Sequence, residues 1–305
     1  MDALPDGMKV LERGWLSANG VLFDAPGRPT ALVDSGYCSH AGQTVALVEQ
    51  ALAGRPLDLL LNTHLHSDHC GGNAALQQRW PALVTAIPPG ESEAVRRWDE
   101  SALSYACTGQ ECPRFVFQRL LQPGSEVSLA GAAWQIHAAP GHDVHAVVLF
   151  EPRSRVLISG DALWDSGFGV VFPELDGDDA FGAVAATLDL IEALDPLLVV
   201  PGHGPVFEDV GAALGRARSR LAAFLLDPAR HAGHAARVLL KFRLLDWQRR
   251  QLGPLLSWAG GTAYLRTVHQ RYFPALPFEA WAGSLVADLE KAGAARREGS
   301  WVLNL

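Results

Sequence analysis

The sequence predicts an α/β sandwich up to about residue 211, followed by a small, mainly helical domain. Over residues 1–211, short β-rich runs alternate with glycine-punctuated turns and helix-like stretches. Several of these runs are almost continuously apolar, which is typical of strands that are covered on both faces. The remaining residues are rich in Ala, Leu and Arg at helical spacing. The predicted domains are therefore 1–211 and 212–305.

Eight segments of the first domain have the composition of strands. "LDLLLNT" and "PLLVVPG" are examples, because Leu and Val fill them and a turn residue ends them. The predicted strands are 20–24, 30–36, 57–63, 82–87, 132–140, 146–151, 155–161 and 196–202. The predicted helices are 40–54, 71–80, 90–106 and 178–194, and acidic residues that can cap a helix precede the last of these.

The second domain is predicted to contain helices and a terminal hairpin. "RARSRLAAFLL", "HAARVLLKFRLLDWQRRQLGPLL" and "EAWAGSLVADLEKAG" have helical patterns and are separated by Pro and Gly. The end of the chain, "GAARREGSWVLNL", is typical of a short hairpin with a Gly-Ser tip. Helices followed by such a hairpin indicate a domain of winged-helix type.

Charge is distributed unevenly around a net value of −8. Residues 1–211 contain 11 Lys and Arg against 27 Asp and Glu, whereas residues 212–305 contain 14 against 6. The acidic part disfavours nucleic-acid binding, while the basic part could attract an anionic small-molecule substrate. Four cysteines are too few for a disulfide scaffold, and neither a signal peptide nor a membrane-spanning stretch is recognised. The cytoplasm is the expected location.

One short stretch contains several side chains that can bind metal ions. "NTHLHSDHCGG" places His64, His66, Asp68 and His69 directly after an apolar run. Imidazole and carboxylate are the ligands that Zn²⁺, Fe²⁺ and Mn²⁺ prefer. Turns after other predicted strands supply three more such side chains, which are His142, Asp161 and His203. A rigid sheet fixes the loops at its strand ends, so these residues are expected to converge.

The order H-x-H-x-D-H, Gly-His, Gly-Asp and Pro-Gly-His resembles the metallo-β-lactamase-fold hydrolase superfamily. The resemblance covers roughly residues 20–205 and implies a four-layer αββα sandwich. It also implies two divalent metal ions, of which Zn²⁺ is the first choice and Fe or Mn are alternatives. One ion is expected on His64, His66 and His142, the other on Asp68, His69 and His203, with Asp161 bridging both.

Five further residues are predicted near this site. Asp34, in "LVDSG", resembles an early aspartate of the superfamily that supports the ligands without binding metal. His145 departs from the superfamily pattern and is a candidate for supporting the ligands or facing the substrate. The aromatic residues after Asp161 could form an apolar wall for the substrate; they are Trp164, Phe168 and Phe172.

The resemblance implies hydrolysis of an ester, thioester, lactone or amide of a small molecule. A water that bridges two divalent ions has its pKa lowered toward about 7, so hydroxide becomes available as the nucleophile. Asp68 is the expected catalytic residue, because its carboxylate could orient that hydroxide and pass on its proton. The terminal domain would then be a lid or a homodimer element.

Two other functions stay open. Some members of the superfamily join this site to a winged-helix-like domain and cut single-stranded RNA, and the basic second domain suits such a nuclease. A non-catalytic ligand sensor is the other alternative, although a complete ligand set argues against it. The glutathione-thioester branch has a similar ligand set, but no basic glutathione-binding motif is evident.

Overall fold

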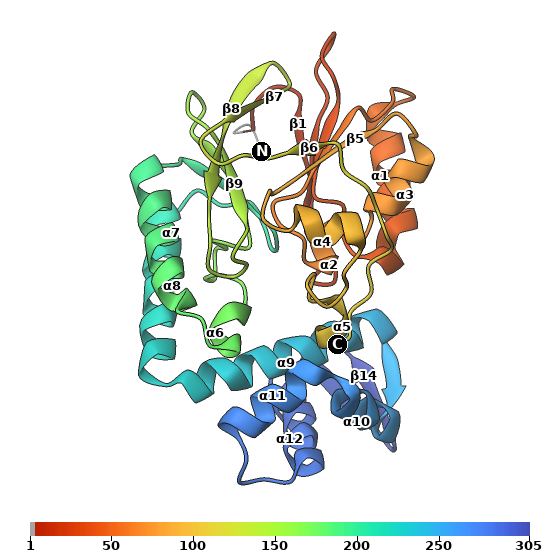
Figure 1. Ribbon diagram of the computed structural model, residues 1–305, viewed down its shortest axis with the longest axis vertical. Helices are drawn as coiled ribbons and strands as arrows, with labels where there is room; N and C mark the ends of the chain where they lie inside the picture. Colours follow the sequence, from red (N-terminus) through yellow and green to blue (C-terminus); the bar gives the residue numbers. More distant parts are fainter. Residues whose placement is uncertain (1–3) are drawn as a thin grey trace. The chain divides into compact units, whose positions relative to one another are not determined.

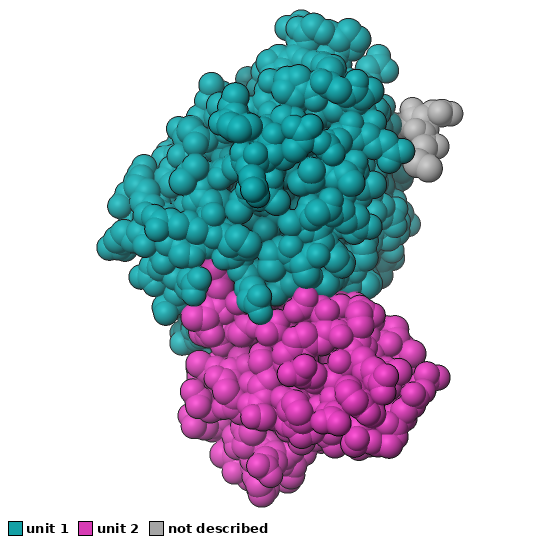
Figure 2. Space-filling model, turned by 90° about the vertical axis from the view of Figure 1, so that its right-hand side faces the viewer, with its two compact units in different colours: residues 1–103, 111–222 teal, residues 104–110, 223–305 magenta. Residues whose placement is uncertain are grey.

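The computed structural model describes residues 4–305 (Figure 1). The chain divides into two compact units, coloured separately in Figure 2. Unit 1 comprises the chain up to Leu103 together with Glu111–Ala222. Unit 2 comprises Ser104–Gln110 and Ala223–Leu305. Each unit is described by itself below.

The first sheet of unit 1 has six strands in the order β1-β2-β3-β4-β5-β6. The pairs β1–β2 and β2–β3 are antiparallel, whereas β3–β4, β4–β5 and β5–β6 are parallel. The strands are β1 (Met8–Leu11), β2 (Gly20–Phe23), β3 (Ala31–Val33), β4 (Leu59–Leu61), β5 (Val84–Ile87) and β6 (Arg119–Leu120).

The second sheet has five strands in the order β11-β10-β9-β8-β7. Within it, β10 and β11 are parallel, and the other neighbouring pairs are antiparallel. The strands are β7 (Glu126–Leu129), β8 (Ala132–Ala138), β9 (Val147–Glu151), β10 (Val156–Gly160) and β11 (Leu198–Pro201).

The two sheets face each other across one apolar core, and helices cover their outer faces. The side chains of β2 point alternately to the two faces of the first sheet. Val21 and Phe23 join the core between the sheets, while Leu22 joins a second apolar cluster. That second cluster contains Val48 of α1 (Ala41–Leu52) and Leu76 of α3 (Asn73–Arg79). In Figure 1, α7 (Ala180–Leu194) and α8 (Val210–Leu226) lie along the second sheet. The predicted four-layer αββα sandwich is therefore confirmed.

Shorter helices fill the loops of unit 1. The remaining helical segments of this unit are η1 (Cys38–His40), α2 (Ser67–Cys70), α4 (Ser92–Arg97) and α6 (Phe172–Asp176). Both α2 and α6 contain residues of the predicted site. They are too short to be stable alone, so their conformation depends on the surrounding sheets.

Unit 2 is mainly helical, as the sequence predicted, but a strand at Arg249–Gln251 interrupts the predicted helical segment "HAARVLLKFRLLDWQRRQLGPLL". Its helices are α5 (Tyr105–Thr108), α9 (Pro228–Trp247), α10 (Leu252–Gly261), α11 (Ala263–Tyr272) and α12 (Phe278–Lys291). A three-stranded antiparallel sheet has the order β12-β14-β13, with β12 (Arg249–Gln251), β13 (Ala295–Glu298) and β14 (Trp301–Asn304). The hairpin with a Gly-Ser tip is present, and the winged-helix assignment stays a prediction.

All eight predicted strands occur in unit 1, and each ends within three residues of its predicted bounds. The sequence did not indicate β1, β6 and β7. Each of these strands lies at the edge of its sheet, where one side lacks a neighbouring strand and several residues are exposed. A weak apolar pattern is expected at such positions.

The predicted helix 90–106 is not continuous, because residues 98–104 between α4 and the helix at Tyr105–Thr108 are not helical. Trp98 has a left-handed backbone conformation with φ of 56°, which ends α4. The side chain of Asp99 then accepts hydrogen bonds from the amides of Ser101 and Ala102. An aspartate bound to its own following backbone favours a turn over a helix.

The predicted helix 71–80 is present as α3, which begins only at Asn73, because two glycines separate it from the short helix α2. A Cβ atom on Gly71 would lie 2.5 Å from the carbonyl oxygen of Ser67, and one on Gly72 would lie 2.4 Å from that of Ser35. The chain therefore passes close to other backbone at this point, which only glycine permits.

The predicted domain boundary at 211/212 falls inside α8. This helix continues to Leu226, and its residues Ala213, Leu214 and Ala217 are buried. In the structure, the units separate between Ala222 and Ala223. Assigning catalysis to residues 1–211 and a winged-helix-like role to residues 212–305 stays a prediction.

Candidate metal centre

The predicted ligands all follow the ends of strands of unit 1. His64 stands three residues after β4, and Asp161 immediately follows β10. His142 and His203 follow β8 and β11 in turns that contain glycine. The structure brings all seven side chains into two groups, within each of which the potential ligand atoms lie within 4.8 Å of one another.

The first group consists of His64, His66 and His142. The Nε2 atom of His64 lies 3.1 Å from Nδ1 of His66, and this Nδ1 lies 2.7 Å from Nε2 of His142. His64 and His142 are buried, while His66 is half-buried. Three ring nitrogens therefore converge on one point.

The second group consists of Asp68, His69, Asp161 and His203. Nε2 of His203 lies 3.0 Å from Oδ2 of Asp68, and Nε2 of His69 lies 3.3 Å from Oδ1 of Asp161. The carboxylate of Asp161 also reaches the first group, because its Oδ2 lies 3.4 Å from Nε2 of His142. Asp161 thus stands between the two groups.

Burial keeps the histidines of the first group neutral. It lowers the pKa of His66 and of His142 to about 4, and the neighbouring His66 further lowers that of His142. Burial and the three neighbouring histidines hold the pKa of His64 well below its ordinary value. Neutral imidazole is the form that binds a metal ion.

The second group has a mixed charge. Burial opposes the charged form of His69, yet the carboxylates of Asp161, Asp34 and Asp68 raise its pKa well above the ordinary value. Burial would likewise raise the pKa of Asp161, but His69 and His203 hold it well below its usual range. Without a metal ion, the proton on His69 balances part of the carboxylate charge.

Hydrogen-bond acceptors beside His64 and His142 fix which nitrogen of each ring faces the first group. Nδ1 of His142 lies 2.5 Å from the carbonyl oxygen of Val170, and Nδ1 of His64 lies 3.1 Å from Oγ1 of Thr63. These Nδ1 atoms donate, because a carbonyl oxygen only accepts and the Thr63 hydroxyl itself donates to Asp34 at 2.8 Å. The Nε2 atoms of His64 and His142 are therefore left with lone pairs that point into the first group.

Asp34 lies on the Nδ1 side of His69, and its role as a supporting residue stays a prediction. Its Oδ2 accepts from Nδ1 of His69 at 2.8 Å, and its Oδ1 accepts from the Thr63 amide at 2.9 Å. Asp34 has φ of 61°, a left-handed conformation that Asp and Asn tolerate better than most residues. The strain is compensated by these buried hydrogen bonds.

The donors fit a pair of divalent cations. A tetrahedral zinc ion with Zn–N distances near 2.0–2.1 Å separates two ligand nitrogens by about 3.3 Å, slightly more than the spacing seen in the first group. His66 can donate from Nδ1 to only one of the two lone pairs that face it, so a cation would relieve the remaining repulsion. In the second group, Nε2 of His69 is among the buried atoms of residues 4–305 that lack a hydrogen-bond partner.

The other predicted neighbours have different surroundings. The ring of Phe172 lies 5.4 Å from His66, and Nε1 of Trp164 donates to Oδ1 of Asp161 at 3.1 Å. Phe168 is buried in a small space lined also by His142 and Asp161. His145 is exposed, and its ring lies against Gly90. The roles of these residues stay predictions.

Sequence reasoning missed three residues at this site. Trp15 stacks on His203 with 5.5 Å between ring centroids and 11° between planes, although nothing in its loop sequence indicated this. Oδ2 of Asp143 lies 3.8 Å from Nε2 of His66. The pKa of Glu91 is raised, chiefly by burial and also by the negative charge of Asp143. Asp143 directly follows a ligand, and Glu91 follows the end of a predicted strand, so their positions were available signals.

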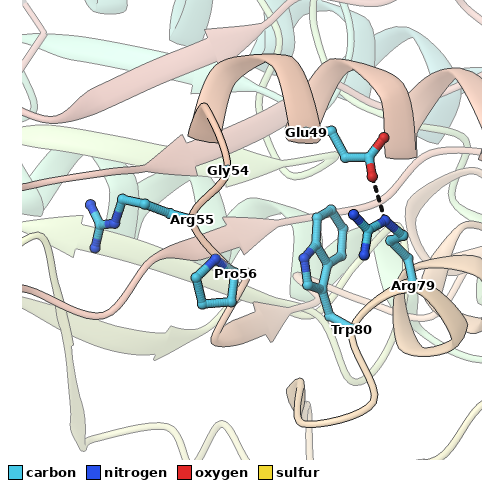
Figure 3. A pocket seen from close by; sticks show the side chains of 6 residues that line it. All are labelled: Glu49, Gly54, Arg55, Pro56, Arg79 and Trp80. Carbon is cyan, nitrogen blue, oxygen red and sulfur yellow. Dashed lines mark hydrogen bonds and ion pairs between the residues drawn. The ribbon is translucent and has the colours of Figure 1, made fainter.

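A separate hollow of about 400 Å³ lies at the opposite end of β4, since residues 54–56 precede this strand. Figure 3 shows Arg79 paired with Glu49 beside the Trp80 indole. Arg55 is paired with Asp24. Because both guanidinium groups are already bound to carboxylates, the hollow offers little for an anionic ligand.

Comparison with known proteins agrees with this geometry. Residues 13–203 match the Metallo-beta-lactamase superfamily. A hydroxyacylglutathione hydrolase of Dechloromonas aromatica (strain RCB) is 32% identical over 168 residues, which are 55% of this chain and 51% of the relative. The hydroxyacylglutathione hydrolase of Acidiphilium cryptum (strain JF-5) is 30% identical over 199 residues, which are 65% and 69% of the two chains.

A solved structure resembles the chain along its whole length. A metallo-beta-lactamase family protein from Thermus thermophilus aligns over 99% of both chains with a TM-score of 0.58, and at 19% identity this likeness concerns the fold alone. This chain belongs to the metallo-beta-lactamase superfamily. It spans about half the length of several curated relatives that it matches. Among residues 4–305, no helix combines the length and apolar character needed to cross a bilayer.

Proposed function

We propose that this protein is a dinuclear-metal hydrolase that cleaves an ester, thioester, lactone or amide of a small molecule. One observation carries the proposal: two groups of ligand atoms lie side by side, and the carboxylate of Asp161 reaches both of them. Simple ligand binding would not require two ions with a shared carboxylate, whereas hydrolysis uses such a pair.

Each of the seven residues has a proposed role. His64, His66 and His142 would hold one ion, and Asp68, His69 and His203 the other, with Asp161 common to both. Bound divalent ions supply Lewis-acid polarisation and a low-pKa water. The pKa of Asp68 is lowered because His69 and His203 outweigh the effect of burial, so its carboxylate stays ionised at neutral pH. Asp68 can therefore accept a proton during the reaction.

The substrate class is supported by relatives. Proteins named hydroxyacylglutathione hydrolase share 30–32% identity with this chain, which makes a thioester the first substrate to test. Zinc is the first metal to test, because five of the seven proposed ligands are imidazoles, with iron and manganese as alternatives. An anionic substrate, the cytoplasmic location and a homodimer stay predictions.

The deciding experiment combines metal analysis with a substrate panel. Purified protein should contain about two divalent ions per chain and should hydrolyse at least one member of a panel of esters, thioesters, lactones, β-lactams and phosphodiesters. Asp161→Ala and His64→Ala should abolish hydrolysis and lower metal content. An unstructured RNA oligomer in the same panel tests the nuclease alternative.

A histidine outside the site provides the control. His137 lies on β8, where its ring contacts Gln135 at 3.2 Å. His137→Ala should retain both metal and activity. The proposal fails if Asp161→Ala keeps full activity, or if protein dialysed against excess zinc, iron or manganese contains no bound ion.

A further inference from the structure

Trp15 is an exposed aromatic residue beside the second ligand group. Its side chain is 54% exposed, although a large indole is usually covered in a folded protein. One face of the indole stacks on the ring of His203, with centroids 5.5 Å apart. An exposed aromatic surface therefore borders a proposed metal ligand.

The loop that carries Trp15 is held firmly. The side-chain oxygen of Asn19 accepts from the Arg13 amide at 2.8 Å, and its amide group donates to the carbonyls of Pro201 and Gly204 at 3.0 and 2.8 Å. The Ala18 amide also donates to the carbonyl of Asp68 at 2.9 Å. These bonds tie the loop directly to the segments around His203 and Asp68.

The ring of Trp164 forms a second wall that is steeply inclined to the first. Its ring meets Trp15 edge-on with centroids 5.4 Å apart and an angle of 67°, and it meets His203 in a similar way at 5.5 Å. The hydrogen bond from its Nε1 to Asp161 fixes the ring. The two indoles thus form a rigid corner, where a ligand would lose little conformational entropy of the protein on binding.

Two cations beside the loops that carry these tryptophans are engaged elsewhere. Arg13 donates to Thr44 and Gln43, which lie on α1. Arg216 is paired with Asp165, the residue after Trp164. An apolar group therefore suits the corner better than an anionic one.

We propose that Trp15 and Trp164 form a binding corner for an uncharged apolar acyl group, such as a phenyl ring or a medium-length aliphatic chain. This inference rests on the proposed hydrolase function and specifies its substrate class. Stacking on an indole, together with burial of apolar surface, favours such an acyl group over acetyl. Trp15 is then a specificity-determining residue that contacts the substrate.

The test compares two thioesters with the same leaving thiol, one phenylacetyl and one acetyl. In Trp15→Ala, the ratio of kcat/KM for the phenylacetyl thioester to kcat/KM for the acetyl thioester should fall roughly 10- to 100-fold. Trp15→Phe should keep most of the preference. Trp301→Ala, which removes an indole stacked on Arg249 in unit 2, should leave the ratio unchanged.

A binding measurement separates failure of this inference from failure of the hydrolase proposal. Phenylacetate should quench the indole fluorescence of the metal-loaded protein and bind roughly 10-fold more tightly than acetate, and Trp15→Ala should remove this difference. If wild-type protein hydrolyses no member of the substrate panel but shows this binding, the corner stands and the hydrolase proposal fails.

Two outcomes would contradict the proposed binding corner. One is equal loss of activity on both thioesters together with loss of metal from Trp15→Ala, which means that Trp15 only supports His203. The other is an unchanged acyl preference and unchanged phenylacetate binding in the same variant, which means that the indole does not contact the ligand.

Discussion

Hydrogen bonds behind the ligands select one ring nitrogen for each of three histidines at the site. Val170, Thr63 and Asp34 lie against Nδ1 of His142, His64 and His69, respectively. As a result, Nε2 of each ring faces the ligand groups. These partners matter for affinity as well as for geometry, because they hold the rings in the orientation that a metal ion requires.

Substitution of Asp34 tests whether these hydrogen-bond partners affect metal affinity. Asp34→Asn keeps a side chain that tolerates φ of 61° but removes the negative charge beside His69. We expect the affinity of the second ion to fall roughly 10- to 100-fold, while the first ion is retained. Competitive titration with a metal chelator would measure both affinities, and equal affinities in wild type and variant would contradict the role given to Asp34.

A buried histidine in unit 2 predicts an acid-sensitive stability. Burial, and then the neighbouring His234, lower the pKa of His231 from 6.5 to about 4. Between these values the unfolded chain binds a proton that the folded unit does not, so the free energy of unfolding decreases as the pH falls from about 6.5 to 4. His231→Gln should lessen this decrease. Urea unfolding near neutral pH and near the lower pKa would measure it, and an identical decrease in the variant would refute the assignment.

Among the elements, the loop after β11 shows how close the backbone approaches the site. A Cβ atom on Gly202 would lie 2.2 Å from Oδ1 of Asp161 and 2.8 Å from Cε1 of His69. We expect Gly202→Ala to displace these side chains and to lower the metal content. Activity should fall at least about 100-fold, since misplaced ligands lose much of their catalytic effect.

A second glycine offers the matched control for this loop. Gly211 lies in α8, and a Cβ atom there would meet nothing within 4 Å. Gly211→Ala should retain metal and activity, and alanine should suit the helix better than glycine does. Circular dichroism would show whether both variants stay folded. Normal metal content in Gly202→Ala would show that the loop can move aside.

Elements differ in how well the sequence predicts them. The strands β4 and β11 are covered on both faces, so a continuous apolar run marks them clearly. The edge strand β7 is largely exposed and lacks such a run. In the predicted helix 90–106, helical composition was overridden by the turn at Trp98 and Asp99. Local backbone bonding decided the structure there.

At the scale of the whole molecule, the proposed ions should stabilise the fold. A ligand present at about 1,000 times its dissociation constant adds about 4 kcal/mol to the free energy of unfolding. Complete chelation should therefore lower the melting temperature by roughly 10 °C, and added zinc should restore it. Calorimetry on matched samples would show this, and an unchanged melting temperature after full metal removal would contradict the dinuclear site.

The fold class and the seven side chains that converge in two groups could be predicted from the sequence alone. Apolar runs report burial directly, and H-x-H-x-D-H with its three distant partners specifies the superfamily. The stacking of Trp15 on His203 and its edge-on contact with Trp164 could be seen only in the tertiary structure. Those contacts join segments far apart in the chain, and their distances depend on how two packed sheets place their loops. No local pattern of residues encodes that placement.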